Sequence, residues 1–291
     1  MRLTFVILLI LTIMISHGQQ EQRLPENTRK KVFLFAGQSN MDGRANGDVL
    51  NEKDLERLSK VAPRIQFYYN HKPVTSLQLT TPTPFLQDKF KFKTMFGPEL
   101  FFGIEMAEKY PEDEFIFIKR SIGGTSLYGC WNPDWTYEKA SLVKEENKPK
   151  LYFDFVDYTK TALKSYNPEA YEIKGMFWVQ GEHDSNVNSW GEKPASSYGD
   201  HLKNLISTVR QDFDSPKLPF IMFQVGNQMV VDGMIRNAKE DKNVFVITQE
   251  YDDKNSADYY PQYDPPLWHY TTESMKRIGI EFFKIYDLNF N

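Results

Sequence analysis

The sequence predicts an α/β fold: a three-layer α/β/α sandwich around a mostly parallel central sheet. Short apolar runs, rich in β-branched and aromatic residues, alternate along the chain with stretches whose apolar residues recur every three or four positions. The runs hardly alternate between apolar and polar side chains, which is typical of strands covered on both faces. Strands that alternate with amphipathic helices form parallel sheets with helices on both sides.

The predicted elements follow one another along the chain without a repeat. Six predicted strands span residues 32–36, 65–69, 115–118, 173–179, 220–225 and 244–248. One helical pattern begins after Pro98, and two others cover residues 155–166 and 198–209. Thr271 is a suitable cap for a last helix. The polar stretch from His71 to Phe96 has the poorest pattern, so we expect an extended surface loop that borders a site.

The N-terminus has the features of a secretory signal peptide. Arg2 precedes a 13-residue apolar run, residues 3–15, and small residues follow it. A run of that length is too short to span a bilayer, which takes about 20 residues. We therefore expect a signal peptide at residues 1–18, a polar leader at 19–30 and a single domain at 31–291. The mature protein would be secreted or periplasmic, without an integral membrane segment.

Composition narrows the choice of partners. The net charge is -4 and the sequence pI is about 5.8, whereas nucleic-acid-binding proteins usually carry a basic patch. We therefore expect no nucleic acid partner. The single cysteine, Cys130, excludes an intrachain disulfide. Aromatic residues make up 15% of the chain; core packing accounts for most of such a surplus, and a sugar-binding cleft is the alternative.

Polar motifs lie at the predicted carboxyl ends of several strands. Gly37-Gln38-Ser39-Asn40-Met41 follows the first strand, a glycine pair at 123–124 follows the third, and Gln180-Gly181-Glu182-His183-Asp184 follows the fourth. His269 precedes the last predicted helix. In a doubly wound sheet the carboxyl ends of the strands meet at one edge, so we expect these groups to lie together.

This set of groups suits acyl transfer. A serine is a weak nucleophile until a neutral imidazole accepts its proton, and the tetrahedral intermediate needs donors aimed at its oxyanion. The N–H groups of Ser39 and Gly124 and the amide of Gln180 are three such donors. Glu182, His183 and Asp184 are consecutive and point in different directions, and no His-Glu-x-x-His motif is present, so we expect no metal and no cofactor.

The order and wording of the motifs resemble one hydrolase family. Gly-Gln-Ser-Asn-Met, Gly-Pro-Glu at 97–99, Gly-Gly-Thr-Ser-Leu at 123–127, Trp-x-Gln-Gly-Glu-x-Asp at 178–184 and a C-terminal histidine are similar to the sialate O-acetylesterase, or carbohydrate esterase family six, branch of the SGNH hydrolases. The resemblance implies a flavodoxin-like fold and a serine esterase that removes O-acetyl groups from carbohydrate such as xylan or sialic acid.

The resemblance implies roles for individual residues. Ser39 becomes the nucleophile, His269 the general base, and Gln180 and a glycine of the 123–124 pair donors to the oxyanion. A neutral His269 implies that activity falls below roughly the imidazole reference pKa of 6.5. A carbohydrate-binding pseudo-esterase without turnover is the alternative function.

The triad acid is missing from its usual place. SGNH hydrolases place an aspartate three residues before the histidine, and that position is Pro266. Glu182 is the preferred replacement, because some members of the family draw a glutamate from the same motif. Asp264 is the second choice, although two prolines follow it. A Ser–His dyad steered by a backbone carbonyl is the third.

Overall fold

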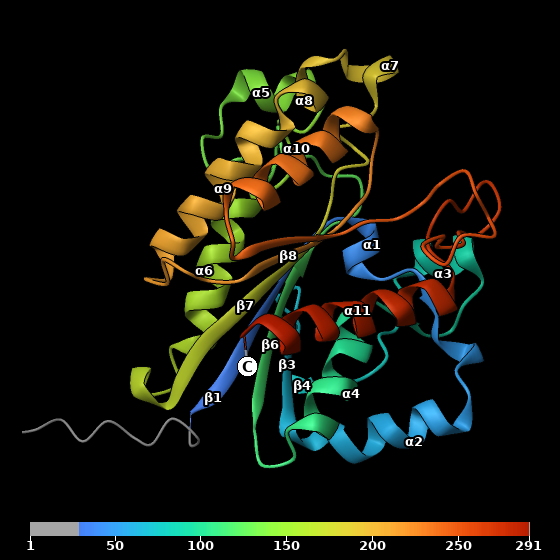
Figure 1. The fold of residues 1–291 in the computed structure, drawn as a ribbon, viewed down its shortest axis with the longest axis vertical. Coiled ribbons are helices and arrows are strands. Elements are labelled where there is room, and N and C mark those ends of the chain that lie inside the picture. The colour runs from blue at the N-terminus through green and yellow to red at the C-terminus, as the bar shows by residue number, and fades with distance from the viewer. Residues whose placement is uncertain (1–28, 291) are drawn as a thin grey trace, which may run out of the picture.

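The computed structural model describes residues 29–290 of the chain (Figure 1). The predicted signal peptide, residues 1–18, lies outside the described residues, as does the predicted leader up to residue 28. Within residues 29–290, none of the helices has the length and apolar character that a membrane crossing needs.

A seven-stranded sheet forms the centre of the fold, in the order β4-β3-β6-β1-β7-β8-β9. Its strands are β1 (Lys30–Gly37), β3 (Ile65–Tyr69), β4 (Thr75–Ser76), β6 (Phe115–Ser121), β7 (Tyr171–Val179), β8 (Phe220–Phe223) and β9 (Val244–Ile247). All neighbours pair in parallel except β3 and β4, which are antiparallel. The predicted mostly parallel sheet is confirmed, and all six predicted strands are present. A small antiparallel pair, β2 (Ala45–Asn46) and β5 (Met95–Phe96), lies apart from the sheet.

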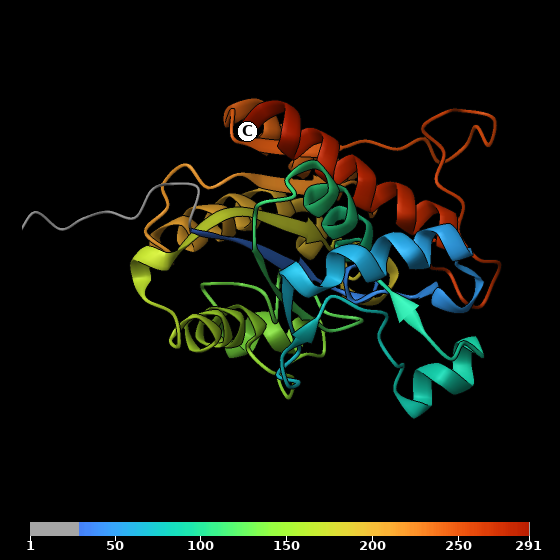
Figure 2. The same ribbon diagram turned by 90° about the horizontal axis from the view of Figure 1, so that it is seen from below.

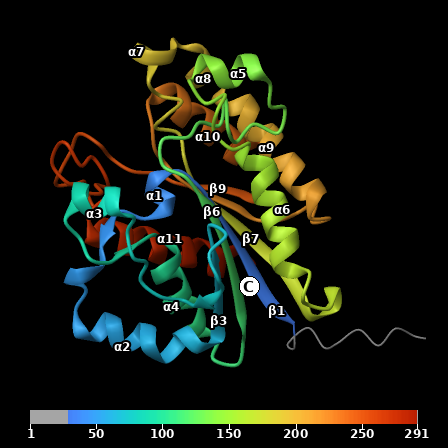
Figure 3. The ribbon, with the colours of Figure 1, turned by 180° about the vertical axis from the view of Figure 1, so that it is seen from behind.

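Helices cover both faces of the sheet (Figures 1 and 3). On one side lie α6 (Leu151–Leu163), α9 (Tyr198–Asp212) and α10 (Gln228–Glu240), and on the other α2 (Glu52–Val61), α4 (Glu99–Lys109) and α11 (Thr272–Phe290). Figure 2 shows the sheet between α11 and α4 above and α6 below. The shorter helices are α1 (Ser39–Asp42), α3 (Pro84–Phe90), α5 (Tyr137–Leu142), α7 (Val187–Trp190) and α8 (Lys193–Ser196), with single 3-10 turns at Gly47–Val49, Ala62–Arg64 and Pro168–Ala170.

Aromatic side chains fill the core between the sheet and the helices α4 and α11. The ring of Phe102 lies 5.0 Å from that of Phe33 and 4.4 Å from that of Phe177, and Phe177 in turn lies 4.9 Å from Phe282. All four side chains are buried. Edge-to-face and tilted contacts at these separations stabilise a core beyond the area they bury. Much of the aromatic surplus of the sequence is therefore core packing.

The prediction of an extended loop from His71 to Phe96 is wrong in part. The segment contains β4, the helix α3 and β5. Thr83 caps α3 by accepting from the N–H of Leu86, and Pro84 occupies its first turn. The segment does border the site, as predicted, because its residues 80–90 supply part of the pocket wall described below.

The sheet order places two strand ends next to each other at a topological switch point. β1 and β7 are neighbours in the sheet, but the chain leaves β1 toward β3 on one side and leaves β7 toward β8 on the other. Crevices at the carboxyl ends of such strands are the usual ligand sites of open α/β sheets. Gln38 and Ser39 follow β1 there, and Gln180 follows β7.

Candidate active site

Ser39 lies at a sharp strand-to-helix turn that requires a glycine before it. Gly37 ends β1 with φ of +149°, and a Cβ atom there would lie 2.1 Å from the carbonyl oxygen of Val179 in β7. The N–H of Gln38 donates to the same carbonyl oxygen at 3.0 Å. Only glycine lets the two strands approach this closely before the chain turns into α1. Ser39, the first residue of α1, is thus fixed at the edge of the sheet.

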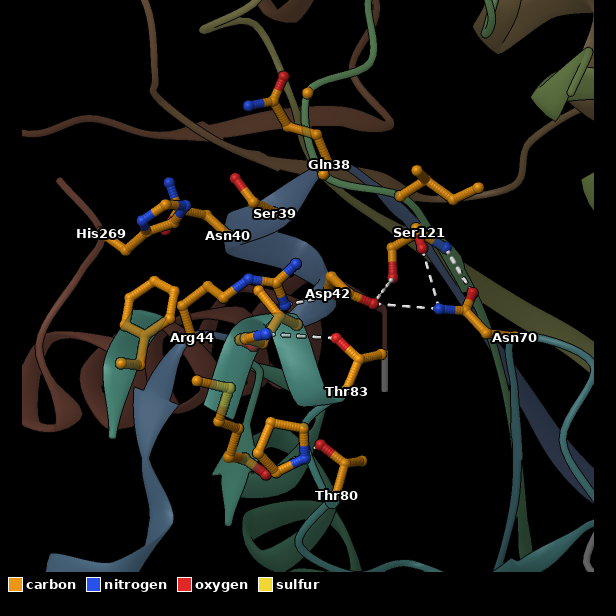
Figure 4. Close-up of a pocket in the computed structure, with 18 of the residues that line it drawn as sticks. Gln38, Ser39, Asn40, Asp42, Arg44, Asn70, Thr80, Thr83, Ser121 and His269 are labelled. Atoms are coloured by element: carbon orange, nitrogen blue, oxygen red, sulfur yellow. Dashed lines mark hydrogen bonds and ion pairs between the residues drawn. The ribbon is translucent and has the colours of Figure 1, made fainter. Parts of the chain in front are cut away.

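A pocket of about 770 Å³ opens above this turn (Figure 4). Four of the five predicted site residues line it: Ser39, Gly124, Glu182 and His269. The predicted serine and histidine therefore share one cavity, although they come from the first strand and from the segment before the last helix. Figure 4 shows the Ser39 hydroxyl and the His269 imidazole on the same side of the pocket.

The His269 ring is oriented by a backbone carbonyl. Its Nδ1 donates a hydrogen bond to the carbonyl oxygen of Leu267. Because a carbonyl can only accept, Nδ1 carries the proton and Nε2 is left unprotonated, as a base that accepts a serine proton must be. The Phe90 ring and the imidazole make an edge-to-face contact, with centroids 5.4 Å apart.

The same surroundings keep His269 neutral. Burial, opposed by the hydrogen bond to Leu267 and assisted by the nearby positive charges of Arg44 and Lys89, lowers the pKa of His269 to about 4. A buried imidazolium next to two cations is unfavourable. The imidazole is therefore in its basic form far below neutral pH.

Glu182 contacts Asn40 in the structure. Its Oε1 accepts from Asn40 Nδ2 at 2.7 Å, and Asn40 Oδ1 accepts weakly, at 3.5 Å, from the N–H of Tyr270, the residue after the histidine. Burial raises the pKa of Glu182, and its Oε2 has no hydrogen-bond partner among residues 29–290. No hydrogen bond joins Glu182 to His269 within this described part. Its role as the triad acid stays a prediction, and its visible link to His269 runs through Asn40.

Asp264, the second candidate for the acid, is exposed. Its backbone carbonyl accepts from the N–H of Leu267 at 3.1 Å and so closes the turn before the histidine. In the described part of the chain, the Asp264 carboxylate makes no hydrogen bond to His269. The backbone carbonyl of Leu267, which is the third alternative from the sequence, is the group that the structure places on Nδ1.

The glycine pair at 123–124 lies beside the serine, with Gly123 the nearer of the two. A Cβ atom on Gly123 would lie 3.3 Å from Ser39 Cβ, whereas one on Gly124 would have nothing within 4 Å. The Gly124 carbonyl accepts from Lys148 Nζ at 2.5 Å, which fixes this peptide. Within residues 29–290 the N–H groups of Ser39, Gly123 and Gly124 donate to no protein acceptor. The predicted choice of Gly124 stays a prediction, and proximity favours Gly123.

Gln180 lies behind the pocket and is fully buried. Its Nε2 donates to Asp184 Oδ2 at 2.6 Å and to the Thr125 carbonyl at 2.9 Å, and its Oε1 accepts from the Tyr198 hydroxyl at 3.2 Å. These two are the close acceptors of the amide hydrogens, and Gln38 Oε1, 3.5 Å from Nε2, is a third and weaker one. The donor role predicted for Gln180 stays a prediction, but the structure does not bring its side chain to the pocket.

Asp184, the last residue of the Trp-x-Gln-Gly-Glu-x-Asp motif, supports the loop that carries the glycine pair. Its two oxygens accept from the N–H groups of Leu127 and Tyr128, each at 2.9 Å. Burial raises the pKa of Asp184 to about 7, against these hydrogen bonds. The next residue back, His183, stacks on Trp190. Throughout the described residues, no group of three or more His, Cys, Asp or Glu side chains is placed to hold a metal ion.

A buried carboxylate below the serine was missed from the sequence. Asp42, the last residue of α1, accepts from the Tyr69 hydroxyl at 2.6 Å and from Ser121 Oγ at 3.0 Å, and it pairs with Arg44 at 2.5 Å. Burial by itself would raise the pKa of Asp42, but the charges of Arg44 and Lys119 hold it below its usual value. The ionised Asp42 ties α1 to β3 and β6. Its position after Ser-Asn-Met was the only signal available.

A fully buried ion pair lies next to Asp42. Lys119 Nζ is 2.7 Å from Glu99 Oε2, and the two side chains are 0% and 1% exposed. The same ammonium group donates to the Asp42 carbonyl at 3.1 Å. Glu99, the last residue of Gly-Pro-Glu, thus acts through Lys119 on the helix that begins with Ser39, and it is not among the residues that line the pocket.

Among residues 29–290, the site combines a serine at a strand-to-helix turn, an imidazole whose Nε2 has no proton, and N–H groups without a protein acceptor, which are the groups that ester hydrolysis needs. The comparison with known families agrees. A family model described as "Carbohydrate esterase, sialic acid-specific acetylesterase" matches residues 29–287. The chain belongs to this family, and it is a carboxylic ester hydrolase.

Two known proteins show how far the similarity extends. A probable carbohydrate esterase of Arabidopsis thaliana is 24% identical over 273 residues, which are 89% of this chain and 91% of that protein. Its crystal structure superposes with a TM-score of 0.63 at 21% identity, over 90% of this chain and 100% of that one. The structure of NanS superposes with a TM-score of 0.61 at 16% identity, over 90% and 97% of the two chains. At these identities the solved structures support the fold.

Proposed function

We propose that this protein removes O-acetyl groups from carbohydrate through an acetyl-enzyme formed on Ser39. The observation that carries the proposal is the meeting of Ser39 and His269 in one pocket of a chain from a carbohydrate esterase family. The signal-peptide features of residues 1–18 support export, so we propose that the enzyme acts on glycans outside the cytoplasm.

The chemistry proceeds in two halves. His269 Nε2 takes the Ser39 proton as Oγ bonds to the acetyl carbonyl carbon, and the carbonyl electron pair moves onto its oxygen. The ester C–O bond then breaks, and the imidazolium gives its proton to the leaving sugar alcohol. Water, deprotonated by the same imidazole, attacks the carbonyl carbon of the acetyl-serine; the bond from that carbon to Ser39 Oγ then breaks, the imidazolium returns the proton to Oγ, and the acetic acid leaves and ionises to acetate. Burial and the nearby cations disfavour the imidazolium, so the Leu267 carbonyl, which accepts from Nδ1–H, is the group that stabilises it.

Exposed aromatic side chains at the pocket mouth support a carbohydrate leaving group. Trp268 and Phe85 both line the pocket and are 63% and 74% exposed. Trp268 adopts φ of 52°, in the left-handed region that a bulky residue rarely occupies. Large apolar rings held in solvent beside a nucleophile offer flat faces on which a pyranose ring stacks.

The test is acetate release from a panel of substrates. Purified protein is incubated with acetylated xylo-oligosaccharides, O-acetylated sialic acid and a simple alkyl acetate, and free acetate is measured enzymatically. We expect the saccharide acetates to have higher kcat/KM values than the alkyl acetate. Binding of the saccharides without any acetate release would instead support the pseudo-esterase alternative.

The lowered pKa of His269 sets the acid limb of the pH profile. The base must be neutral, and it becomes protonated only as the pH falls through about 4. We expect kcat/KM to stay level from pH 7 to about pH 5 and to fall below that, rather than near the reference value of 6.5. Initial rates on the preferred acetate ester, with thermal unfolding at each pH as control, measure this. A midpoint near 6.5 would show that the imidazole is not buried in the working enzyme.

The contact of Glu182 with Asn40 gives a second prediction. If Glu182 acts through Asn40, Glu182→Gln keeps an oxygen that accepts from Asn40 and lowers kcat by less than tenfold. Asp264→Asn, the matched carboxylate-to-amide control, leaves kcat unchanged because its side chain is exposed. A loss of two or more orders of magnitude in Glu182→Gln, with unaltered thermal unfolding, would make Glu182 the group that orients His269 directly. A similar loss in Asp264→Asn would transfer that role to Asp264.

A further inference from the structure

The side-chain amide of Gln38 is held in one orientation by its neighbours. Its Oε1 accepts from the backbone N–H of His183 at 3.3 Å and from Gln180 Nε2 at 3.5 Å. Both donors belong to the segment that follows β7. Because Oε1 faces these two donors, the NH₂ group of Gln38 is turned the other way.

That NH₂ group faces the pocket. Gln38 lines the cavity and is only 5% exposed, and within residues 29–290 its Nε2 donates to no acceptor. Figure 4 shows the Gln38 amide nitrogen on the side where Ser39 and His269 lie. The amide nitrogen is accessible from the pocket rather than fully buried, so a ligand group bound there can accept a hydrogen bond from it.

Gln38 also has a fixed relation to the nucleophile. It is the residue before Ser39, its N–H is tied to β7 through the Val179 carbonyl, and its own carbonyl accepts from the N–H of Asp42 at 2.7 Å. Hydrogen bonds therefore hold both the N–H and the carbonyl of Gln38 in place. Donors that are already in place when charge develops are the ones that lower a barrier, because they need no reorganisation.

We propose that Gln38 is a catalytic residue whose Nε2–H donates to the oxyanion of the tetrahedral intermediate, together with the N–H groups of Ser39 and Gly123. In this arrangement Gln180 is a positioning residue: its amide contacts Gln38 Oε1 while Asp184 and Thr125 hold it in place. The inference rests on the proposed function, since it assigns the group that stabilises the acetyl-transfer intermediate.

The decisive variant is Gln38→Glu. Glutamate has nearly the same shape and keeps an oxygen for the His183 N–H, but it replaces the donating NH₂ by an oxygen. Loss of one oxyanion donor lowers kcat about 10²- to 10³-fold. We expect Gln38→Glu and Gln38→Ala to show that loss with KM changed less than threefold. The rate of inactivation by diethyl p-nitrophenyl phosphate, whose phosphoryl oxygen takes the place of the oxyanion, falls in parallel.

Gln180→Ala is the comparison variant. As a positioning residue it lowers thermal stability and reduces kcat less than Gln38→Glu does. A Gln38→Glu enzyme with kcat within fivefold of the wild type overturns the proposal, and so does a Gln180→Ala enzyme that is folded and impaired more strongly than Gln38→Glu. The failure of the proposed function has a different signature, namely full activity in Ser39→Ala or no acetate release by the wild type.

Discussion

Replacement of Ser39 by alanine lowers kcat for acetate release by a factor on the order of 10⁴ to 10⁶. In serine hydrolases, loss of the nucleophile removes the covalent route and leaves only the catalysis that oxyanion donors and substrate binding provide. Ser39 is the first residue of α1, and nothing in its short side chain supports the fold. The thermal unfolding of the variant therefore stays within about 2 °C of the wild type, as expected for a change of less than about 0.5 kcal/mol in unfolding free energy.

The control is another serine of the same pocket. Ser121 donates its hydroxyl to Asp42 and lines the cavity, but within residues 29–290 it makes no hydrogen bond to a histidine. Ser121→Ala keeps at least a tenth of the wild-type kcat. A fluorophosphonate probe, read out by intact-protein mass, labels the wild type and Ser121→Ala but not Ser39→Ala. Retention of more than a tenth of the activity by Ser39→Ala would exclude Ser39 as the nucleophile.

Replacement of Lys119 by methionine lowers the free energy of unfolding by about 3–5 kcal/mol, the usual cost of removing one partner of a buried ion pair. Glu99 would be left 1% exposed without its countercharge. Burial already raises the pKa of Glu99 against the opposing charge of Lys119, and without Lys119 the carboxyl is driven further toward its neutral form. Urea unfolding at pH 7 measures the loss.

The double variant Glu99→Gln/Lys119→Met separates charge from packing. It leaves no buried charge at this position, so we expect it to regain at least half of the stability lost in Lys119→Met. Activity falls in both variants, because both lose the hydrogen bond from Lys119 Nζ to the Asp42 carbonyl at the end of α1. A Lys119→Met protein less than 1 kcal/mol below the wild type would show that the pair is not a buried ion pair in solution.

The sheet was predictable because strands that are buried on both faces appear in the sequence as uninterrupted apolar runs. Residues 32–36 of β1 are all 0% exposed, so no polar residue interrupts the run. Elements without that constraint escaped prediction. β4 consists of two exposed residues, and α3 has seven residues with one buried side chain. In α10 the contact with α9 is made by Gly233 against Gly199, and the buried Asn237 donates to the Gly199 carbonyl, so the apolar stripe that marks a helix is interrupted.

The site was predictable as a place but not as a set of contacts. Gly37-Gln38-Ser39 and Gln180-Gly181-Glu182 follow neighbouring strands, so their convergence follows from the topology. Which glutamine faces the pocket depends on Asp184 and Thr125, which take the Gln180 amide, and no local pattern records that choice. In the same way, the carbonyl that accepts from His269 belongs to the backbone of Leu267. Every residue type has such a carbonyl, so the sequence does not indicate which one makes this contact.

The order of the strands also determines when activity first arises during synthesis. Ser39 follows the central strand β1, whose two neighbours, β6 and β7, are translated much later, and Asn40 meets Tyr270, 230 residues further along the chain. A ribosome that has completed half of this chain has made the proposed nucleophile, Ser39, but neither the proposed base, His269, nor β7. The nascent polypeptide is therefore catalytically silent until almost its full length has been translated. A terminated or cleaved fragment that retains Ser39 but lacks the last helix and the histidine before it is expected to hydrolyse no ester.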